Sequence, residues 1–145
     1  MAKLEAGITI NRPVEEVFAF TSNPESEPLW RPELLEMEKT SEGPIGVGTT
    51  YREVMQFLGR RIESTGEITK YEPNNMIAMK TTSGPLPFEL TGTYQPVEGG
   101  TELTFEIEAD VGGFFRFAEP LVARMGKRQM ETQLANIKDL LEAPA

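Results

Sequence analysis

The sequence contains neither cysteine nor histidine. The lack of cysteine excludes disulfides and thiol chemistry, and the lack of histidine removes the commonest general base and metal ligand. Zinc centres, Ser-His-Asp triads and Cys-His dyads are therefore excluded. The glycine pattern GVG at residues 46–48 is a turn before a strand and is too short for a phosphate-binding loop. We expect no metal, no nucleotide and no other cofactor.

Basic residues are also scarce. The 14 Lys and Arg residues stand against 23 Asp and Glu residues, which gives a net charge of −9. Nucleic acid and anionic membrane surfaces repel such a chain, so neither is expected as a partner. No stretch approaches the roughly 20 apolar residues of a membrane span, and the opening MAKLEAGITI lacks the apolar run of a signal peptide. We expect a cytoplasmic protein of 145 residues in one domain, monomeric or homodimeric and without membrane insertion.

The first part of the chain predicts a strand followed by two short helices. Apolar residues alternate with polar or small residues over residues 4–10, which is the period of a half-buried strand. Pro13 suits the first position of a helix, and the pair Asn23-Pro24 ends that helix. The segment ESEPLWRPEL predicts a second, shorter helix with Trp30 near its end.

From about Leu35 to Val111 the chain predicts six more strands, which makes seven in total. Turn signals separate them: GPIGVG, LGR, EPNN, SGPLP and EGG. Two hairpins allow the direction of side chains to be predicted. A turn at Gly59-Arg60 pairs Glu53 with Gly66 on the inner face and, on the outer face, Arg52 with Glu67.

The second hairpin is predicted to turn at Gly99-Gly100. The alternation of side chains along this hairpin and along the strand before it predicts which residues face inward: Ile77, Met79, Thr81, Phe88, Leu90, Gly92, Tyr94, Leu103, Phe105, Ile107 and Ala109. A slip of two residues in either hairpin would leave these faces unchanged, because side chains alternate with a period of two.

The segment from 116 to 142 is the longest predicted helix. Its apolar side has two parts that are rotated by about a quarter turn. The first part contains Phe117, Ala118, Leu121, Val122 and Met125, and the second contains Met130, Leu134, Ile137 and Leu141. Gly126, Gln129 and Gln133 lie where the two parts meet. A helix that covers one face of an antiparallel sheet would bury this side, so two amides and a glycine at its centre need an explanation.

These elements and several motifs resemble a known superfamily. The motifs are ITINRPVEEVFAFTSNPESEPLW, GVGTTYREV, ITKYEPNNMIAMKT, YQPVEGGTELTFEIE and a closing helix that ends in NIKDLLE. Over nearly the whole chain they resemble the START-like SRPBCC superfamily, most closely its polyketide cyclase/dehydrase branch. The resemblance implies an α+β helix-grip fold, in which a seven-stranded curved antiparallel sheet wraps around a long C-terminal helix and two short helices follow the first strand. It also implies a hydrophobic tunnel between the sheet and that helix.

Small residues on the inner face agree with such a tunnel. The first hairpin sets only Ser64 and Gly66 opposite Met55 and Glu53, and the second has Gly92 on its inner face, which leaves room for a ligand. The expected ligand-binding residues are Trp30, Met55, Phe57, Met79, Phe88, Leu90, Tyr94, Phe105, Met125, Gln129, Met130 and Gln133. The alternative for each of them is a role in core packing.

The tunnel also suggests a role for the unusual helix residues. Gly126 would lower the helix surface or permit a bend, and the two amides, Gln129 and Gln133, would offer hydrogen bonds into the tunnel. The alternative is that the helix bends at Gly126 and the amides lie at a solvated edge.

Glu53 is the leading candidate for acid–base chemistry. It is predicted on the inner face, with no basic residue across from it, and such burial would suit it as a proton donor or acceptor near neutral pH. The alternative places it at the open end of its strand, either hydrated or paired with one of three arginines, Arg31, Arg124 or Arg128.

Three functions are compatible with these features. The first is binding or transport of a hydrophobic small molecule, such as a lipid, a sterol or a polyketide-like compound, and the lack of histidine favours it. The second is a polyketide cyclase, aromatase or dehydratase in which Glu53, Tyr51 or Tyr94 moves a proton. The third is a chaperone-activator-like interaction domain, which predicts a large exposed apolar patch and a sealed core.

Overall fold

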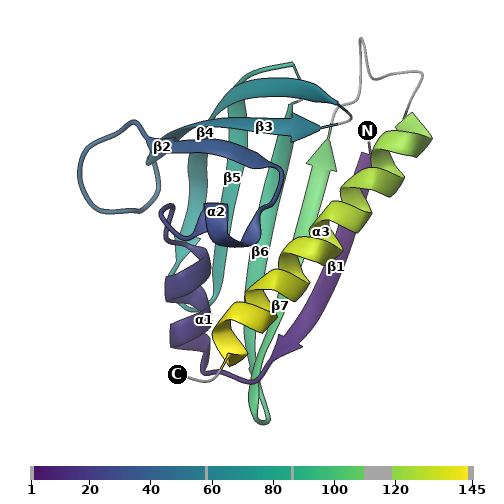
Figure 1. Cartoon of the computed structure of the whole chain (residues 1–145). Helices are drawn as coiled ribbons and strands as arrows, with labels where there is room; N and C mark the ends of the chain where they lie inside the picture. The colour runs from purple at the N-terminus through teal and green to yellow at the C-terminus, as the bar shows by residue number, and fades with distance from the viewer. Residues whose placement is uncertain (1, 58, 86, 110–118, 144–145) are drawn as a thin grey trace.

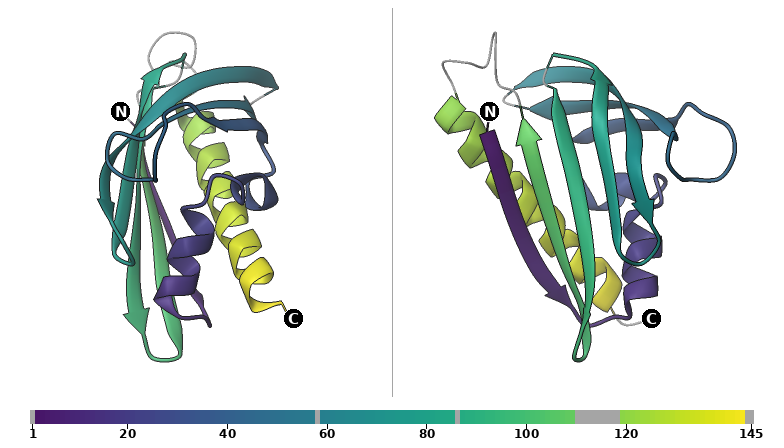
Figure 2. Two further views of the ribbon diagram at one scale, coloured as in Figure 1. Left: turned by 90° about the vertical axis from the view of Figure 1, so that its left-hand side faces the viewer. Right: turned by 180° about the vertical axis from the view of Figure 1, so that it is seen from behind.

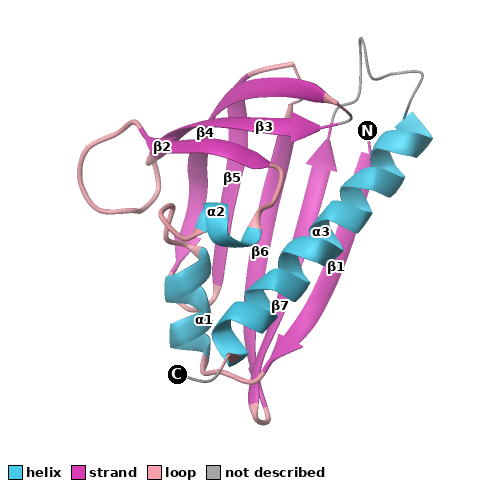
Figure 3. Cartoon of the chain, in the orientation of Figure 1, coloured by secondary structure: helices cyan, strands magenta, loops and turns pink. Residues whose placement is uncertain are grey.

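The computed structural model describes residues 2–57, 59–85, 87–109 and 119–143. An antiparallel sheet curls around one long helix, and two short helices lie beside that helix (Figures 1 and 3). The strands are β1 (Ala2–Ile10), β2 (Leu34–Lys39), β3 (Thr50–Phe57), β4 (Arg60–Glu72), β5 (Met76–Ser83), β6 (Phe88–Val97) and β7 (Gly100–Ala109). The helices are α1 (Val14–Thr21), α2 (Glu27–Trp30) and α3 (Glu119–Glu142). This is the predicted helix-grip fold, and the predicted Phe117 and Ala118 of the long helix lie outside the described residues.

The sheet has the strand order β1-β7-β6-β5-β4-β3-β2, and all neighbouring strands are antiparallel. The first strand of the chain thus pairs with the last strand, β7. The long strand β4 carries register shifts at Thr65/Gly66 and at Ile68/Lys70. Such bulges bend a strand, and Figure 2 shows the sheet curving around the side on which α3 lies.

The first hairpin has a different register from the predicted one. Phe57 pairs with Arg60, and Glu53 therefore pairs with Ser64 and not with Gly66. Gly59 has a φ of 75°, which suits the second residue of a two-residue turn, where the prediction placed it first. The shift of two residues leaves every side chain on its predicted face.

The outer face of the same hairpin shows the consequence of this shift. Arg52 lies opposite Thr65, and its Nε is 2.6 Å from Oε1 of Glu63, so Glu63 replaces the predicted Glu67 as its partner. The second hairpin repeats the pattern, because Val97 pairs with Gly100 and Gly99 takes the positive φ, here 81°.

The two short helices follow from local signals. Pro13 precedes the first turn of α1, and Glu15 and Glu16 lie in that turn, where carboxylates complement the helix dipole. The hydroxyl of Ser26 shares its one proton between the carbonyl oxygens of Asn23, at 2.8 Å, and of Phe20. These bonds join the start of α2 to the end of α1.

The long helix α3 is fixed at its C-terminal end. Glu142 accepts hydrogen bonds from the backbone amide of Asn11, at 2.8 Å, and from Lys138 Nζ, at 2.7 Å. Lys138 also donates to the carbonyl oxygen of Thr9 at 2.7 Å. The end of α3 is therefore held to the end of β1.

The apolar core lies between the C-terminal half of α3, α1 and the sheet. From α3 it contains the buried residues Met130, Leu134 and Ile137, which belong to one cluster with Phe18 of α1 and Leu103 of β7. The N-terminal half of α3 faces a different environment, which forms the candidate site. Among the described residues, no helix combines the length and the apolar character that crossing a bilayer requires.

Candidate functional site

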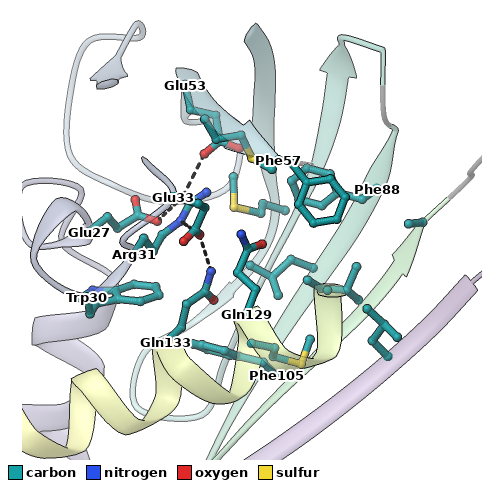
Figure 4. Close-up of a pocket in the computed structure, with 18 of the residues that line it drawn as sticks. Glu27, Trp30, Arg31, Glu33, Glu53, Phe57, Phe88, Phe105, Gln129 and Gln133 are labelled. Atoms are coloured by element: carbon teal, nitrogen blue, oxygen red, sulfur yellow. Dashed lines mark hydrogen bonds and ion pairs between the residues drawn. The ribbon is translucent and has the colours of Figure 1, made fainter. Parts of the chain in front are cut away.

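A cavity of about 100 Å³ lies between the N-terminal half of α3 and the inner face of the sheet. We call it the main cavity (Figure 4). Its lining comes from α2 and the residues just after it, from α3 and from β1, β3, β5, β6 and β7: Leu4, Glu27, Trp30, Arg31, Glu33, Glu53, Met55, Phe57, Met79, Phe88, Leu90, Phe105, Ile107, Ala109, Val122, Gly126, Gln129, Met130 and Gln133. Most of these side chains are apolar, so the cavity suits an apolar guest.

A smaller space of about 50 Å³, the second chamber, adjoins the main cavity. The two spaces share the lining residues Glu27, Trp30, Met79, Leu90 and Phe105. The remaining walls of the second chamber come from the end of α1 and from the strands of the sheet, and they include both predicted tyrosines, Tyr51 and Tyr94.

Neither tyrosine lines the main cavity. The hydroxyl of Thr21 donates its proton to the carbonyl oxygen of Val17. The Tyr94 hydroxyl, 2.5 Å from Thr21 Oγ1, therefore donates to Thr21 Oγ1. Burial raises the pKa of Tyr94 well above its ordinary value and that of Tyr51 to about 12. Both phenols are therefore neutral at physiological pH.

The helix α3 presents one continuous stripe to the cavity. Val122, Gly126, Gln129, Met130 and Gln133 line it, at the spacing of one helix face. This stripe contains one residue of each predicted apolar part, Val122 and Met130, together with the glycine and the two amides. This face excludes two residues that the prediction had included. Met125 is 36% exposed and does not line the cavity, and Leu121 is 50% exposed.

Gly126 permits close contact between α3 and β1. A Cβ at this position would lie 2.7 Å from Cδ1 of Leu4, closer than carbon atoms approach without displacement. The expectation that glycine lowers the helix surface agrees with this contact. Gly92 differs, because a Cβ there would lie 3.4 Å from the ring of Phe105, an ordinary van der Waals distance, so the space that the sequence predicted beside Gly92 is bordered by that ring.

One end of the main cavity carries a group of charged side chains centred on Arg31. Arg31 Nη1 is 2.9 Å from Glu53 Oε2 and 3.1 Å from Glu27 Oε1, and Arg31 Nε is 3.3 Å from Glu33 Oε1. The four side chains are at most 15% exposed. We call them the Arg31 cluster. Figure 4 shows them gathered at one end of the cavity, with Phe57 and Phe88 at the other.

Backbone structure places the members of the Arg31 cluster together. Glu27 and Arg31 occupy adjacent turns at the two ends of α2, and the amide of Arg31 donates to the carbonyl of Glu27 at 2.9 Å. Glu33 lies just before β2, where its carbonyl accepts from the amide of Gln56 in β3 at 2.9 Å. Glu53 projects from the same strand β3.

Burial and the neighbouring charges shift the pKa values of two members of the cluster, Glu27 and Arg31. Burial raises the pKa of Glu27 to about 7, with Arg31 opposing the shift and the other two carboxylates, Glu53 and Glu33, adding to it. Burial alone would lower the pKa of Arg31, but its three carboxylate partners raise it above the ordinary value. Glu27 therefore exchanges a proton near neutral pH, while Arg31 stays charged.

Several polar groups in the cavity wall have unused hydrogen-bonding capacity. Gln133 Nε2 donates to Glu33 Oε1, but Glu33 Oε2 is buried without a partner among the described residues. The indole Nε1 of Trp30 is likewise buried and unpartnered within the described part of the chain. Gln129, which is half-buried, forms no side-chain hydrogen bond to another described residue. Buried polar groups in this state normally bind water or a ligand.

The structure brings together most of the residues predicted to bind a ligand. The main cavity is lined by Trp30, Met55, Phe57, Met79, Phe88, Leu90, Phe105, Gln129, Met130 and Gln133. Glu53 also lines it, and Glu53 is buried and paired with Arg31, which was one of the alternatives considered for it. The sequence reasoning missed Glu27 and Glu33. The sequence signal for Glu27 was its spacing of four residues from Arg31, which places two side chains next to each other on a helix, beside the only tryptophan.

A curled sheet that grips one long helix over an apolar internal cavity defines a helix-grip protein. Residues 1–142 match the family described as polyketide cyclase/dehydrase and lipid transport. The chain therefore belongs to that family. No protein with curated functional information matches the sequence.

Solved structures share this fold. TTHA0849 from Thermus thermophilus has a TM-score of 0.83 and 18% identity, over 97% of this chain and 99% of that chain. A START superfamily protein from Mycobacterium smegmatis has a TM-score of 0.81 and 15% identity, over 98% of each chain. The di-domain ARO/CYC StfQ from the steffimycin biosynthetic pathway has a TM-score of 0.76 and 13% identity, over 94% of this chain and 50% of that chain. At these identities the likeness establishes the fold alone.

Proposed function

We propose that this protein binds or carries an apolar small molecule in the main cavity. The observation that carries the proposal is the space itself, which the described residues leave between α3 and the sheet and which phenylalanine and methionine side chains surround. Flexible methionines and flat aromatic rings adapt to aliphatic or planar guests. The family's link to lipid transport supports the same conclusion.

The cavity also bears on the chaperone-activator-like alternative. That alternative requires a sealed core and a large exposed apolar patch. The described residues line a cavity instead, and of their exposed large apolar side chains, which are Leu29, Leu35, Val47, Leu121, Met125 and Leu140, only Leu121 and Met125 lie one helical turn apart. These features favour a binding function.

Trp30 provides a direct test. It is the only tryptophan and it lines the cavity, so its fluorescence reports occupancy without a label. Neutral lipids, sterols, aromatic polyketides and simple alcohols such as octanol are titrated, and thermal unfolding is followed in parallel. A bound guest changes the fluorescence with saturation and raises the melting temperature. Failure of every compound to produce either change would contradict the proposal.

Two variants on the same helix provide a matched control. Val122→Phe places a ring in the cavity and is expected to weaken binding by about tenfold or more, because the guest and the ring compete for one space. Met125→Phe adds the same ring three residues away, outside the cavity, and is expected to leave binding unchanged. If Val122→Phe does not fold, Ala109→Leu on β7 repeats the test from the opposite wall.

An enzymatic function of the cyclase or dehydratase type is the second candidate. The observation that favours it is the pKa of Glu27, which burial raises to about 7 in the wall of the cavity. A carboxyl group of this kind is suited to moving a proton at neutral pH. Glu27→Gln is expected to abolish turnover of a poly-β-ketone surrogate while the surrogate still binds. Full activity in this variant would remove Glu27 from the mechanism.

A further inference from the structure

The polar end of the main cavity is negatively charged. Three carboxylates, those of Glu27, Glu33 and Glu53, surround the single guanidinium of Arg31, which leaves a formal charge of −2, or −1 when Glu27 holds a proton. Of the described residues that line the cavity, Arg31 is the only basic one. Its contacts with three carboxylates leave no positive charge to neutralise an anionic guest.

One acceptor in this charged group is unused. Glu33 Oε1 accepts hydrogen bonds from Gln133 and Arg31, whereas Glu33 Oε2 is buried and unpartnered among the described residues. The Glu33 side chain is only 5% exposed, so bulk water does not satisfy this oxygen. A buried carboxylate oxygen without a donor is costly, and a guest that supplies a donor removes that cost.

The remaining wall determines the body of the guest. Figure 4 shows Phe57 and Phe88 on the far side of the space from Glu27 and Arg31. A guest therefore meets charge at one end and hydrocarbon at the other. The unpartnered indole N–H of Trp30 is a neutral donor, and it does not offset the negative charge.

From this arrangement we infer the class of ligand. The main cavity selects apolar molecules that end in a hydrogen-bond donor, with a protonated amine bound most tightly. It rejects molecules of the same shape that end in a carboxylate, because such an end group would lie against the Arg31 cluster. This inference rests on the proposed function and specifies its ligand.

A matched series of guests tests it. Octylamine, octanol and octanoate have the same hydrocarbon tail and differ at the end group, and each is titrated against the wild-type protein at neutral pH by Trp30 fluorescence and calorimetry. We expect octylamine to bind at least about tenfold more tightly than octanoate, with octanol between them. Octanoate binding as tightly as octylamine would overturn the inference, and octanol binding in the same experiment would leave the proposed function intact.

A pair of variants assigns the selectivity to Glu33. Glu33→Gln keeps the shape of the side chain and removes its charge, so we expect the preference for octylamine over octanoate to shrink by roughly tenfold. Glu36→Gln removes a charge from the exposed face of the adjoining strand and is expected to leave the preference unchanged. Equal effects of the two substitutions would show that only net charge matters and would contradict the assigned site. If Glu33→Gln does not fold, the ligand series on the wild-type protein decides the inference alone.

Discussion

Leu4 of β1 occupies the space that a side chain at position 126 of α3 would need. The Cδ1 atom of Leu4 lies 2.7 Å from the position of a Cβ on Gly126. Glycine in a helix interior costs up to about 1 kcal/mol relative to alanine, so its presence here reflects the contact with the sheet. This contact places Gly126 against β1 in the wall of the main cavity.

We expect Gly126→Leu to destabilise the protein by about 1–3 kcal/mol through overpacking. The same substitution in a Leu4→Ala background should cost less, because the smaller residue leaves room for the new side chain. Urea denaturation of the wild type, both single variants and the double variant measures the coupling. Strict additivity of the two substitutions would contradict the proposed contact.

Glu27 is expected to make stability depend on pH. Its pKa in the folded protein is about 7 against an ordinary value of 4.5, so between these pH values the folded state holds a proton that the unfolded state has lost. The free energy of unfolding therefore falls as pH rises through this window, by at most about 3 kcal/mol, and the contribution is fully present below pH 4.5.

The measurement compares the wild type with Glu27→Gln. The variant cannot titrate at this position, so the difference in the free energy of unfolding between the two proteins isolates Glu27 from the other carboxyl groups. We expect this difference to change in favour of the variant as pH rises from about 4.5 to about 7, with Arg31, Glu33 and Glu53 present in both proteins. A difference that stays constant with pH would show that Glu27 ionises normally.

Arg31 is expected to be essential for the stability of the cluster at neutral pH. Arg31→Met leaves three buried carboxylates without a cation, and loss of one partner of a buried ion pair typically costs about 3–5 kcal/mol. The cost should be smaller near pH 5, where protonation relieves the repulsion. Arg61→Met, which removes an exposed ion pair with Glu36 at 3.0 Å, serves as the control and should change the melting temperature little.

Local patterns in the sequence were enough to predict the strands, the helices and the faces of the sheet. They did not determine the hairpin registers. Gly59 and Gly99 each fit either position of a two-residue turn, and in the structure both occupy the second position with a positive φ. The period of two then preserved the inner face despite the shift, so Met55 and Phe57 line the cavity as predicted.

The Arg31 cluster could not be predicted in the same way. Glu33 and Glu53 are 20 positions apart, and they meet only because β2 pairs with β3 and because α2 places Arg31 between them.

Met125 is a residue that the sequence wrongly predicted to face the interior. It was assigned to the interior because it is apolar and lies near the edge of the predicted helix face, whereas in the structure α3 turns Gly126 toward Leu4 and leaves Met125 36% exposed.

The boundary between the main cavity and the second chamber consists partly of Met79 and Leu90, which line both spaces. Methionine has an unbranched side chain with three rotatable bonds, and its rotation changes the room on either side without moving the backbone. If the main cavity binds a guest as proposed, rotation of Met79 would join the two spaces, and we expect longer guests to extend toward Tyr94 of the second chamber while short ones occupy the main cavity alone.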